Sequence, residues 1–414
     1  MACVAAGKQG SSAGYSGTQP RNGMDMAKEL AFVLINPYSI RKSRTGGIIA
    51  RYLVQTDLKL VGARMFGASR ELAGTLADYL ETYDADDPDK CKLLAGYVRS
   101  NYTPDSVLGR SHRSMMLLFE GENAVAKIYE ITGSLRQTWG TGLTVRDTFG
   151  DFVCDEQTGK MLYFEPSVIV GPNVRVTGEL LKIWCRQFES EAGIVRGASD
   201  VPEGPDVHRT LVLIKPENFR QPSLRAGNIM SLLSRAGLRI VAVKKFAMSV
   251  AQAEKFYEPV RANLRRIFPL IGKARAAQAL STAFGLSVDP DRLTSLCELI
   301  APDFADFEFE NIVEFMTGRR PSSCSDAIKQ LKGTEECLAI VYEGVDAVNK
   351  VRDILGSTDP SKASSGTIRR EFGTNIMVNA AHASDSAENA VREMAIIDIE
   401  RDAQFEELIK AHYP

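Results

Sequence analysis

Residues 30–40 read LAFVLINPYSI, and residues 209–219 read RTLVLIKPENF. In both stretches a short apolar run is followed by a polar residue and a proline, which is typical of a buried strand that ends at a turn. The likeness continues downstream, because residues 46–69 (GGIIARYLVQTDLKLVGARMFGAS) match residues 227–249 (GNIMSLLSRAGLRIVAVKKFAMS). The sequence therefore predicts two copies of one domain.

The spacing between matching segments shows where the copies differ in length. The offset is 179 at the first strand and 180 at the second, and it reaches 223 for EGENAV at 120 against EGVDAV at 343 and for TVRDTF at 144 against TIRREF at 367. The second copy thus carries about 43 additional residues between 250 and 342. Residues 258–308 have a mostly helical pattern, and we expect a helical insertion packed beside the second domain, with a lid over a site as the alternative.

Each copy alternates strand and helix patterns in the order strand, helix, strand, helix, strand, helix, strand. The predicted fold class is α+β, with two ferredoxin-like (βαββαβ) domains whose four-stranded antiparallel sheets are covered by helices on one face. We place the first domain at 29–200 and the second at 208–414. Residues 1–28, which are rich in glycine, serine and alanine, are expected to form a flexible tail.

Composition excludes several classes of protein. With 44% hydrophobic and 25% charged residues and a formal charge of -2, the chain has no bias toward nucleic acid. The seven cysteines are scattered, with no CxxC pair, which argues against a disulfide framework or a zinc site and favours a reducing compartment. No run of about 18 apolar residues could span a membrane. We therefore expect a cytoplasmic protein without nucleic-acid or membrane partners.

One of the four histidines lies among small residues in NIMVNAAHASDS, residues 375–386. A lone histidine of this kind is most often a structural side chain with hydrogen-bonded ring nitrogens. Small neighbours also leave an imidazole accessible, and histidine is well suited to carry a proton or a phosphoryl group near neutral pH. The residues around His382 must decide between these readings.

The second copy resembles the nucleoside diphosphate kinase family. The matching segments occur in family order: LVLIKPENF at 211, FY at 256, VRDILGSTDP at 351, GTIRREF at 366 and NAAHASDSAENAVREM at 379. The resemblance implies transfer of the γ-phosphate of a nucleoside triphosphate to a nucleoside diphosphate by a ping-pong mechanism, with His382 as the phosphorylated residue. The implied partners are nucleoside triphosphates and diphosphates.

The same resemblance assigns roles to other residues of the second copy. Glu393 and Ser384 match the partners of the catalytic imidazole, and Tyr257 matches a tyrosine beside it. Cationic and polar groups that match phosphate contacts are Lys215, Arg352, Arg369 and Thr358. Asn379 matches the residue that binds the sugar hydroxyl, while Phe309 and Ile376 match the two apolar residues that sandwich the base.

The expected cofactor is Mg²⁺, held mainly by the nucleotide phosphates and water, with no metal site of the protein's own. Asp385 follows the family pattern, but a hydrogen bond within the turn is at least as good an explanation for it. The family usually has glycine after the catalytic histidine, where this chain has Ala383; the glycine suggests a backbone with positive φ.

The first copy resembles the family only as a degenerate domain. It has Asn36 in place of Lys215, Tyr129 in place of Arg352 and, roughly, Val170 in place of His382. It keeps an arginine, Arg146, at the place of Arg369. Without nucleophile and lysine this copy is expected to be inactive. It could act as a pseudo-subunit that packs on the second copy, or as a nucleotide-binding regulatory module, and the whole chain could form a homo-oligomer.

Two other functions remain open on the sequence alone. The protein could be a catalytically weak scaffold that keeps the nucleotide pocket for binding. It could also be a phosphotransferase that passes the phosphoryl group to a protein histidine, since such an enzyme would use the same nucleophile.

Overall fold

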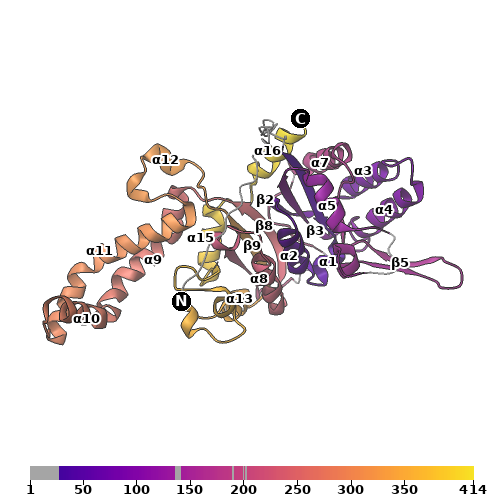
Figure 1. The fold of residues 1–414 in the computed structure, drawn as a ribbon. Helices are drawn as coiled ribbons and strands as arrows, with labels where there is room; N and C mark the ends of the chain where they lie inside the picture. The colour runs from indigo at the N-terminus through magenta and orange to yellow at the C-terminus, as the bar shows by residue number, and fades with distance from the viewer. Residues whose placement is uncertain (1–27, 136–140, 189–190, 199, 201–202) are drawn as a thin grey trace, which may run out of the picture.

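A computed structural model describes residues 28–135, 141–188, 191–198, 200 and 203–414 of the chain. Its N-terminal half is built on a four-stranded antiparallel sheet in the order β2-β3-β1-β6 (Figure 1). This is the ferredoxin-like strand order. The elements of this half are β1 (Glu29–Ile35), α1 (Pro37–Arg41), α2 (Thr45–Gln55), β2 (Lys59–Gly67), α3 (Arg70–Leu80), α4 (Pro88–Asn101), β3 (Arg113–Gly121), α5 (Ala124–Thr132), α6 (Val145–Phe149), β4 (Asp151–Cys154), β5 (Met161–Glu165), β6 (Val168–Ile169) and α7 (Val174–Phe188).

The C-terminal half repeats this plan with a sheet in the order β10-β7-β9-β8. The predicted α+β class and the two four-stranded antiparallel sheets are thus confirmed. The elements of this half are β7 (Val207–Ile214), η1 (Pro216–Asn218), α8 (Arg225–Leu233), η2 (Ser234–Ala236), β8 (Arg239–Phe246), α9 (Val250–Ile271), α10 (Lys273–Phe284), α11 (Pro290–Thr317), η3 (Pro321–Ser323), α12 (Asp326–Gln330), β9 (Cys337–Val345), α13 (Ala347–Leu355), η4 (Pro360–Lys362), α14 (Ile368–Phe372), β10 (Ala381–Ala383), α15 (Ala387–Ile396) and α16 (Ala403–His412).

The first sheet is covered on both faces, so the prediction of helices on one face is wrong for it. Val33 and Phe32 are neighbours in β1, yet they belong to two separate core clusters, because successive side chains of a strand point to opposite faces. Helices α2 and α5 contribute to the first cluster, and α3, α4, α7 and α16 contribute to the second. The continuous apolar run of β1 agrees with this double burial.

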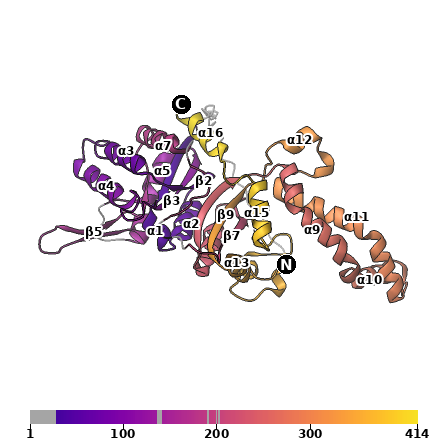
Figure 2. The same cartoon turned by 180° about the vertical axis from the view of Figure 1, so that it is seen from behind.

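The insertion forms an arm that projects from the second domain (Figure 2). Its helical character is confirmed, but packing beside the domain is wrong: α9 and α11 extend outward together and pack on each other. The rings of Phe268 and Phe304 stack with their centroids 4.0 Å apart, and Leu293, Cys297 and Ala301 of α11 are buried. Part of the apolar surface of the arm is therefore buried between α9 and α11, whereas other apolar side chains of the arm, such as Phe284 and Leu299, are exposed.

The two halves meet along matching elements. Helix α2 packs against α8, and the edge strands β2 and β8 lie next to each other. Gly46 and Gly227 allow the close approach of the helices, because a Cβ atom on either glycine would collide with the backbone oxygen of the other. The interface is thus built from equivalent surfaces of the two copies.

The last helix crosses from the second half to the first. Phe405 and Ile409 of α16 are each 1% exposed and lie in the core cluster of the first sheet, and the Tyr413 hydroxyl donates to the backbone oxygen of Leu30 at 2.5 Å. Residues 403–412, expected in the second domain, therefore complete the core of the first. Among the described residues, no helix has both the length and the apolar character needed to cross a bilayer.

Candidate active site

His382 lies at the edge of the second sheet, in β10, opposite Leu213 of β7. Its Nε2 atom is 3.0 Å from Oε2 of Glu393, and the Ser384 hydroxyl donates to the same oxygen at 2.6 Å. Glu393 and Ser384 are buried, whereas the imidazole is 21% exposed. The structure therefore brings together the three residues that were predicted as catalytic.

Helix α15 positions Glu393 beside the imidazole. The helix begins after Ser386, whose hydroxyl accepts a hydrogen bond from the backbone N–H of Asn389. Near its end, Arg392 donates to the backbone oxygens of Lys255 and Phe256 in α9. The cap and the arginine hold α15 in place. Asp385 accepts a hydrogen bond from the Asn389 side chain at 2.6 Å, the local role weighed from the sequence.

Two aromatic residues of α9 flank the imidazole. The ring centroids of Phe256 and Tyr257 lie 5.1 Å and 6.1 Å from that of His382, both in edge-on geometry. The Tyr257 hydroxyl is buried without a hydrogen-bond partner among the described residues, and burial raises its pKa well above the usual value. Tyr257 was predicted; Phe256 was not, although it is the other half of the FY pair.

The backbone immediately before β10 is in the left-handed region, at Ala380 with φ 71°. Its N–H donates to Oε1 of Glu217 at 2.9 Å, and its oxygen accepts from the N–H of Lys215 at 3.0 Å and from the Asn218 amide at 2.9 Å. Three hydrogen bonds thus hold a conformation that is unfavourable for alanine. The positive φ expected at Ala383 is wrong, because that residue has ordinary strand geometry in β10.

The half-buried Lys215 and the buried Asn379 form a polar pair near the strand ends. The Lys215 ammonium donates to Oδ1 of Asn379 at 2.7 Å and to the backbone oxygen of Met377 at 2.9 Å. Burial lowers the pKa of Lys215 to about 8, although the nearby carboxylate of Glu217 acts in the opposite direction. The Asn379 amide group donates to the backbone oxygens of Thr358 and Ile376, so this residue also fixes the loop around the lysine.

Arg369 brings a second, half-buried cation to the site. Its guanidinium donates to the backbone oxygens of Gly356 at 2.9 Å and Ala381 at 3.3 Å, and to the Thr358 hydroxyl at 3.5 Å. Its Nε atom is buried without a partner among the described residues. Burial, followed by the positive charge of Arg352, lowers its pKa to about 10. Arg352 is exposed on α13, and its effect on the Arg369 pKa indicates that the two guanidinium groups are close enough to interact.

The two residues predicted to sandwich a base differ in environment. Phe309 is 6% exposed and belongs to the core, with the Arg261 guanidinium 5.3 Å from its ring centroid. Ile376 is 62% exposed. Of the two, only Ile376 presents an open apolar surface.

The first copy shows which features of the site are structural. Arg146 donates to the backbone oxygens of Gly133 and Val168, the counterparts of Gly356 and Ala381. Its Nε atom, however, is bonded to the oxygen of Pro166. In the first copy Arg146 therefore anchors the backbone around Gly133 and Val168 with all of its bonded nitrogens. In the second copy the Nε atom of Arg369 has no partner among the described residues.

At the position of His382, the first copy has Ile169. Ile169 pairs with Leu34 as His382 pairs with Leu213, so the predicted place at Val170 is wrong by one residue. The pairing of β6 with β1 and of β10 with β7 shows which residues of the two copies are equivalent. The sequences of the two copies differ too much in this segment to be aligned directly. Beside it, the buried carboxylate of Glu165 accepts hydrogen bonds from Asn36 at 3.1 Å and Tyr97 at 2.6 Å.

The carboxylate of Glu165 changes the character of the degenerate site. Burial raises its pKa, which its hydrogen bonds oppose. Asn36 replaces Lys215 and turns its amide toward this carboxyl group. A phosphate group at this place would therefore meet an acidic group where the second copy offers a lysine.

No group of three or more histidine, cysteine, aspartate or glutamate side chains that could hold a metal ion occurs in the described part of the chain. The charged groups near His382 include the cations Lys215, Arg352, Arg369 and Arg392 and the carboxylates of Glu217 and Glu393. Such a set is suited to an anionic ligand that brings its own cation.

Comparison with known proteins identifies the family. The family model described as nucleoside diphosphate kinase matches residues 208–270 and 309–401, thereby omitting most of the arm. The nucleoside diphosphate kinase of Kosmotoga olearia is 31% identical over 190 residues, which cover 46% of this chain and 88% of that protein. That of Azorhizobium caulinodans is 31% identical over 189 residues, covering 46% and 91%.

Among the solved structures that match this chain is an NDP kinase from Pyrobaculum aerophilum. It is 25% identical in sequence, the match has a TM-score of 0.33, and it covers 48% of this chain and 97% of that one. The relatives from Kosmotoga and Azorhizobium are matched over most of their length at about 31% identity. The chain belongs to the nucleoside diphosphate kinase family.

Proposed function

We propose that the protein is a nucleoside diphosphate kinase that transfers the γ-phosphoryl group of a nucleoside triphosphate to a nucleoside diphosphate through phospho-His382. The observation that carries this proposal is the hydrogen bond between Nε2 of His382 and the buried carboxylate of Glu393. A carboxylate can only accept at this distance, so the proton resides on Nε2 and the lone pair on Nδ1. Nδ1 has no hydrogen-bond partner among the described residues and is the nucleophile.

The reaction consists of two matching transfers. In the first, Nδ1 forms a bond to the γ-phosphorus while the bond from that phosphorus to the bridging oxygen breaks, and the diphosphate leaves with the electron pair. In the second, the terminal oxygen of another nucleoside diphosphate attacks the phosphorus and the bond to Nδ1 breaks. The Glu393 carboxylate offsets the positive charge that the imidazole carries while it is phosphorylated.

Cationic groups around the imidazole support binding of the phosphates. Lys215, Arg352 and Arg369 supply positive charge, and the unpaired Arg369 Nε and Tyr257 hydroxyl are buried donors that a phosphate oxygen would satisfy. Bound with the nucleotide, Mg²⁺ would neutralise part of the phosphate charge. Ile376 offers apolar surface for the base, and Asn379 keeps one Oδ1 lone pair for a sugar hydroxyl.

Steady-state transfer from ATP to GDP tests the proposal. His382→Ala should abolish GTP formation, because the nucleophile is lost. His208→Ala is the matched control, since His208 is exposed in β7 and outside this site, and it should retain full activity. GTP formation by purified His382→Ala at the wild-type rate would refute the proposal. Formation of GTP from GDP also distinguishes this function from the two alternatives, because a binding scaffold would transfer no phosphoryl group and a protein-histidine phosphotransferase would transfer it to a protein.

A further inference from the structure

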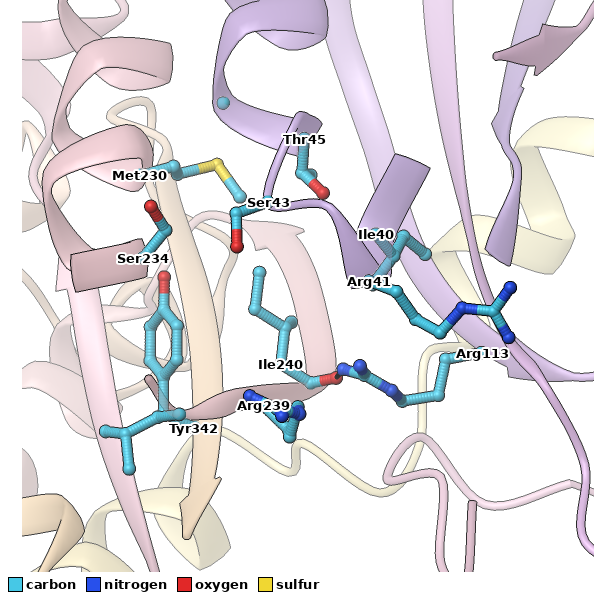
Figure 3. Close-up of a pocket in the computed structure, with 12 residues that line it drawn as sticks. Ile40, Arg41, Ser43, Thr45, Arg113, Met230, Ser234, Arg239, Ile240 and Tyr342 are labelled. Carbon is cyan, nitrogen blue, oxygen red and sulfur yellow. Dashed lines mark hydrogen bonds between the residues drawn. The ribbon is translucent and has the colours of Figure 1, made fainter. Parts of the chain in front are cut away.

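A small pocket lies between the two domains, away from His382. It has a volume of about 30 Å³ and is lined from one side by residues of α1, α2 and the loop between them, and from the other by residues of α8, η2, β8 and β9 (Figure 3). A cavity of this size holds one or two water molecules or one small ion, because about 10–15 Å³ is needed for a single water. It is too small for a nucleotide.

Two hydroxyl groups in this pocket lack partners. The Thr45 hydroxyl and the Tyr342 hydroxyl are buried without a hydrogen bond to any described residue, and their residues are 3% and 1% exposed. Figure 3 shows the hydroxyl end of Tyr342 pointing toward Ser234 and Met230. A buried hydroxyl without a partner is costly, so a bound group that accepts hydrogen bonds is expected here.

Three arginines line the same pocket, and two of them, Arg41 and Arg239, have no carboxylate partner among the described residues. Arg113 binds the carboxylate of Asp200 through Nε and Nη2 and donates to the backbone oxygen of Ile240 through Nη1. Arg239 donates to backbone oxygens of Asp200 and Gly237, at 3.0 Å and 2.9 Å. Arg41 makes no hydrogen bond or ion pair within the described part of the chain. Positive charge therefore exceeds negative charge among the residues that line the pocket.

The repeat supplies an internal comparison, because the equivalent residues of the other copy line a second pocket. There Arg220 and Lys59 take the places of Arg41 and Arg239, but Glu336 stands where the first pocket has Arg113. Glu336 pairs with Lys59 at 3.0 Å and with Lys245 at 3.1 Å.

Phe119 replaces Tyr342 in that copy, so no hydroxyl is left unpaired at its position. The second pocket neutralises its own charge, whereas the first combines excess positive charge with unpaired hydroxyls. The two pockets therefore differ in net charge and in the number of unpaired hydrogen-bond donors.

We propose that the pocket between the domains binds one small tetrahedral oxyanion of the inorganic phosphate class. Hydroxyl donors and guanidinium groups are the usual ligands of such an anion, and the planar arginine fork suits its oxygens. The bound anion links groups of both copies and thereby stabilises the docking of the domains. This site does not depend on the proposed kinase activity.

Binding of ³²P-labelled inorganic phosphate to the full chain by equilibrium dialysis tests the proposal. The variant Arg41→Gln/Arg239→Gln should bind phosphate at this site at least about tenfold more weakly, because two charged donors are lost. The matched control, Lys59→Gln/Arg220→Gln, removes the same charge at the equivalent positions and should bind as the wild type does. All these proteins keep the His382 site, so phosphate bound there does not affect the comparison.

Tyr342→Phe keeps the shape of the core and removes one hydroxyl, and it should also weaken phosphate binding by about tenfold. Crystals soaked in tungstate should show anomalous density between Arg239 and Tyr342. Wild-type phosphate affinity in both Arg41→Gln/Arg239→Gln and Tyr342→Phe would overturn the proposal, as would a pocket that contains only water in the tungstate-soaked crystals.

Discussion

At the scale of the residue, the proposed mechanism depends on Glu393, whose carboxylate determines which nitrogen of His382 carries the proton. Its carboxylate is held by the Ser384 hydroxyl at 2.6 Å and lies 3.0 Å from Nε2. The edge-on rings of Phe256 and Tyr257 further restrict the imidazole. The nucleophile is thus prepared by its neighbours before any nucleotide arrives.

Glu393→Gln removes the negative charge and allows the wrong tautomer, because an amide NH₂ can donate to Nε2. We expect kcat to fall roughly 10²-fold, within the range for groups that support a catalytic histidine. KM should change little, since Glu393 faces the imidazole. Coupled steady-state assays measure both constants, and an unchanged kcat would show that the carboxylate does not prepare the imidazole.

The lowered pKa of Lys215 leads to a prediction for kcat/KM at alkaline pH. Burial lowers its pKa to about 8, so in the free enzyme the ammonium loses its proton above that pH and attracts phosphate less. We expect kcat/KM, which reports groups of the free enzyme, to decline above about pH 8. An arginine keeps its charge to higher pH than a lysine, so Lys215→Arg should move the decline to higher pH. A wild-type profile that stays flat to pH 10 would contradict the assignment.

Individual residues differed in how far sequence could place them. His382, Glu393 and Ser384 could be predicted together because their spacing follows a family pattern, and the structure joins them by hydrogen bonds. The role of Glu217 was missed, because only the fold brings its carboxylate to the backbone of Ala380. The strained position was misplaced for the same reason: a dihedral angle depends on contacts that spacing does not show.

At the scale of the element, the arm of α9, α10 and α11 is the clearest departure from the repeat. The helical pattern could be predicted from apolar spacing, but not the direction in which the helices extend. Direction depends on which apolar faces pair, and here α9 and α11 pair with each other. The first part of α9 contacts the site through Phe256 and Tyr257, and the end of α11 contacts it through Phe315, whose ring centroid lies 5.8 Å from the Lys215 ammonium.

Shortening the arm should leave catalysis intact. The stacked rings of Phe268 and Phe304 show that the two helices are close there, so a short Gly-Ser linker can replace residues 268–304. We expect kcat/KM for ATP and GDP to stay within about threefold of the wild-type values. Far-UV circular dichroism, divided by the number of helical residues that remain, should be unchanged and would show that the shortened protein is folded. A loss of more than about tenfold in a folded protein would show that the arm serves as a lid.

At the scale of the whole molecule, the two copies are interlocked. The surfaces of α2 and α8 meet at paired glycines, and α16 from the end of the chain completes the core of the first copy. The repeat predicted that the copies could pack as pseudo-subunits. The packing of α16 on the first copy could not be predicted, because the sequence of an amphipathic helix does not reveal which apolar surface the helix will cover.

Phe405→Ala tests this interlocking. Phe405 is 1% exposed and packs against Phe66 and Phe188, so the cavity should lower the free energy of unfolding by about 3–5 kcal/mol. Trp184 lies in the same cluster and reports unfolding by its fluorescence in urea. The control Phe284→Ala removes a ring that is 72% exposed and should change stability by less than about 0.5 kcal/mol. Equal stability of the two variants would refute the structural role of α16.

The measurement that most directly tests the central claim is labelling of the protein with γ-³²P-ATP, followed by isolation of the labelled enzyme and addition of GDP. We predict acid-labile label on His382 alone, which GDP discharges completely as labelled GTP. A protein that makes GTP from ATP and GDP without labelled His382, or whose label on His382 is not transferred to GDP, would contradict the account.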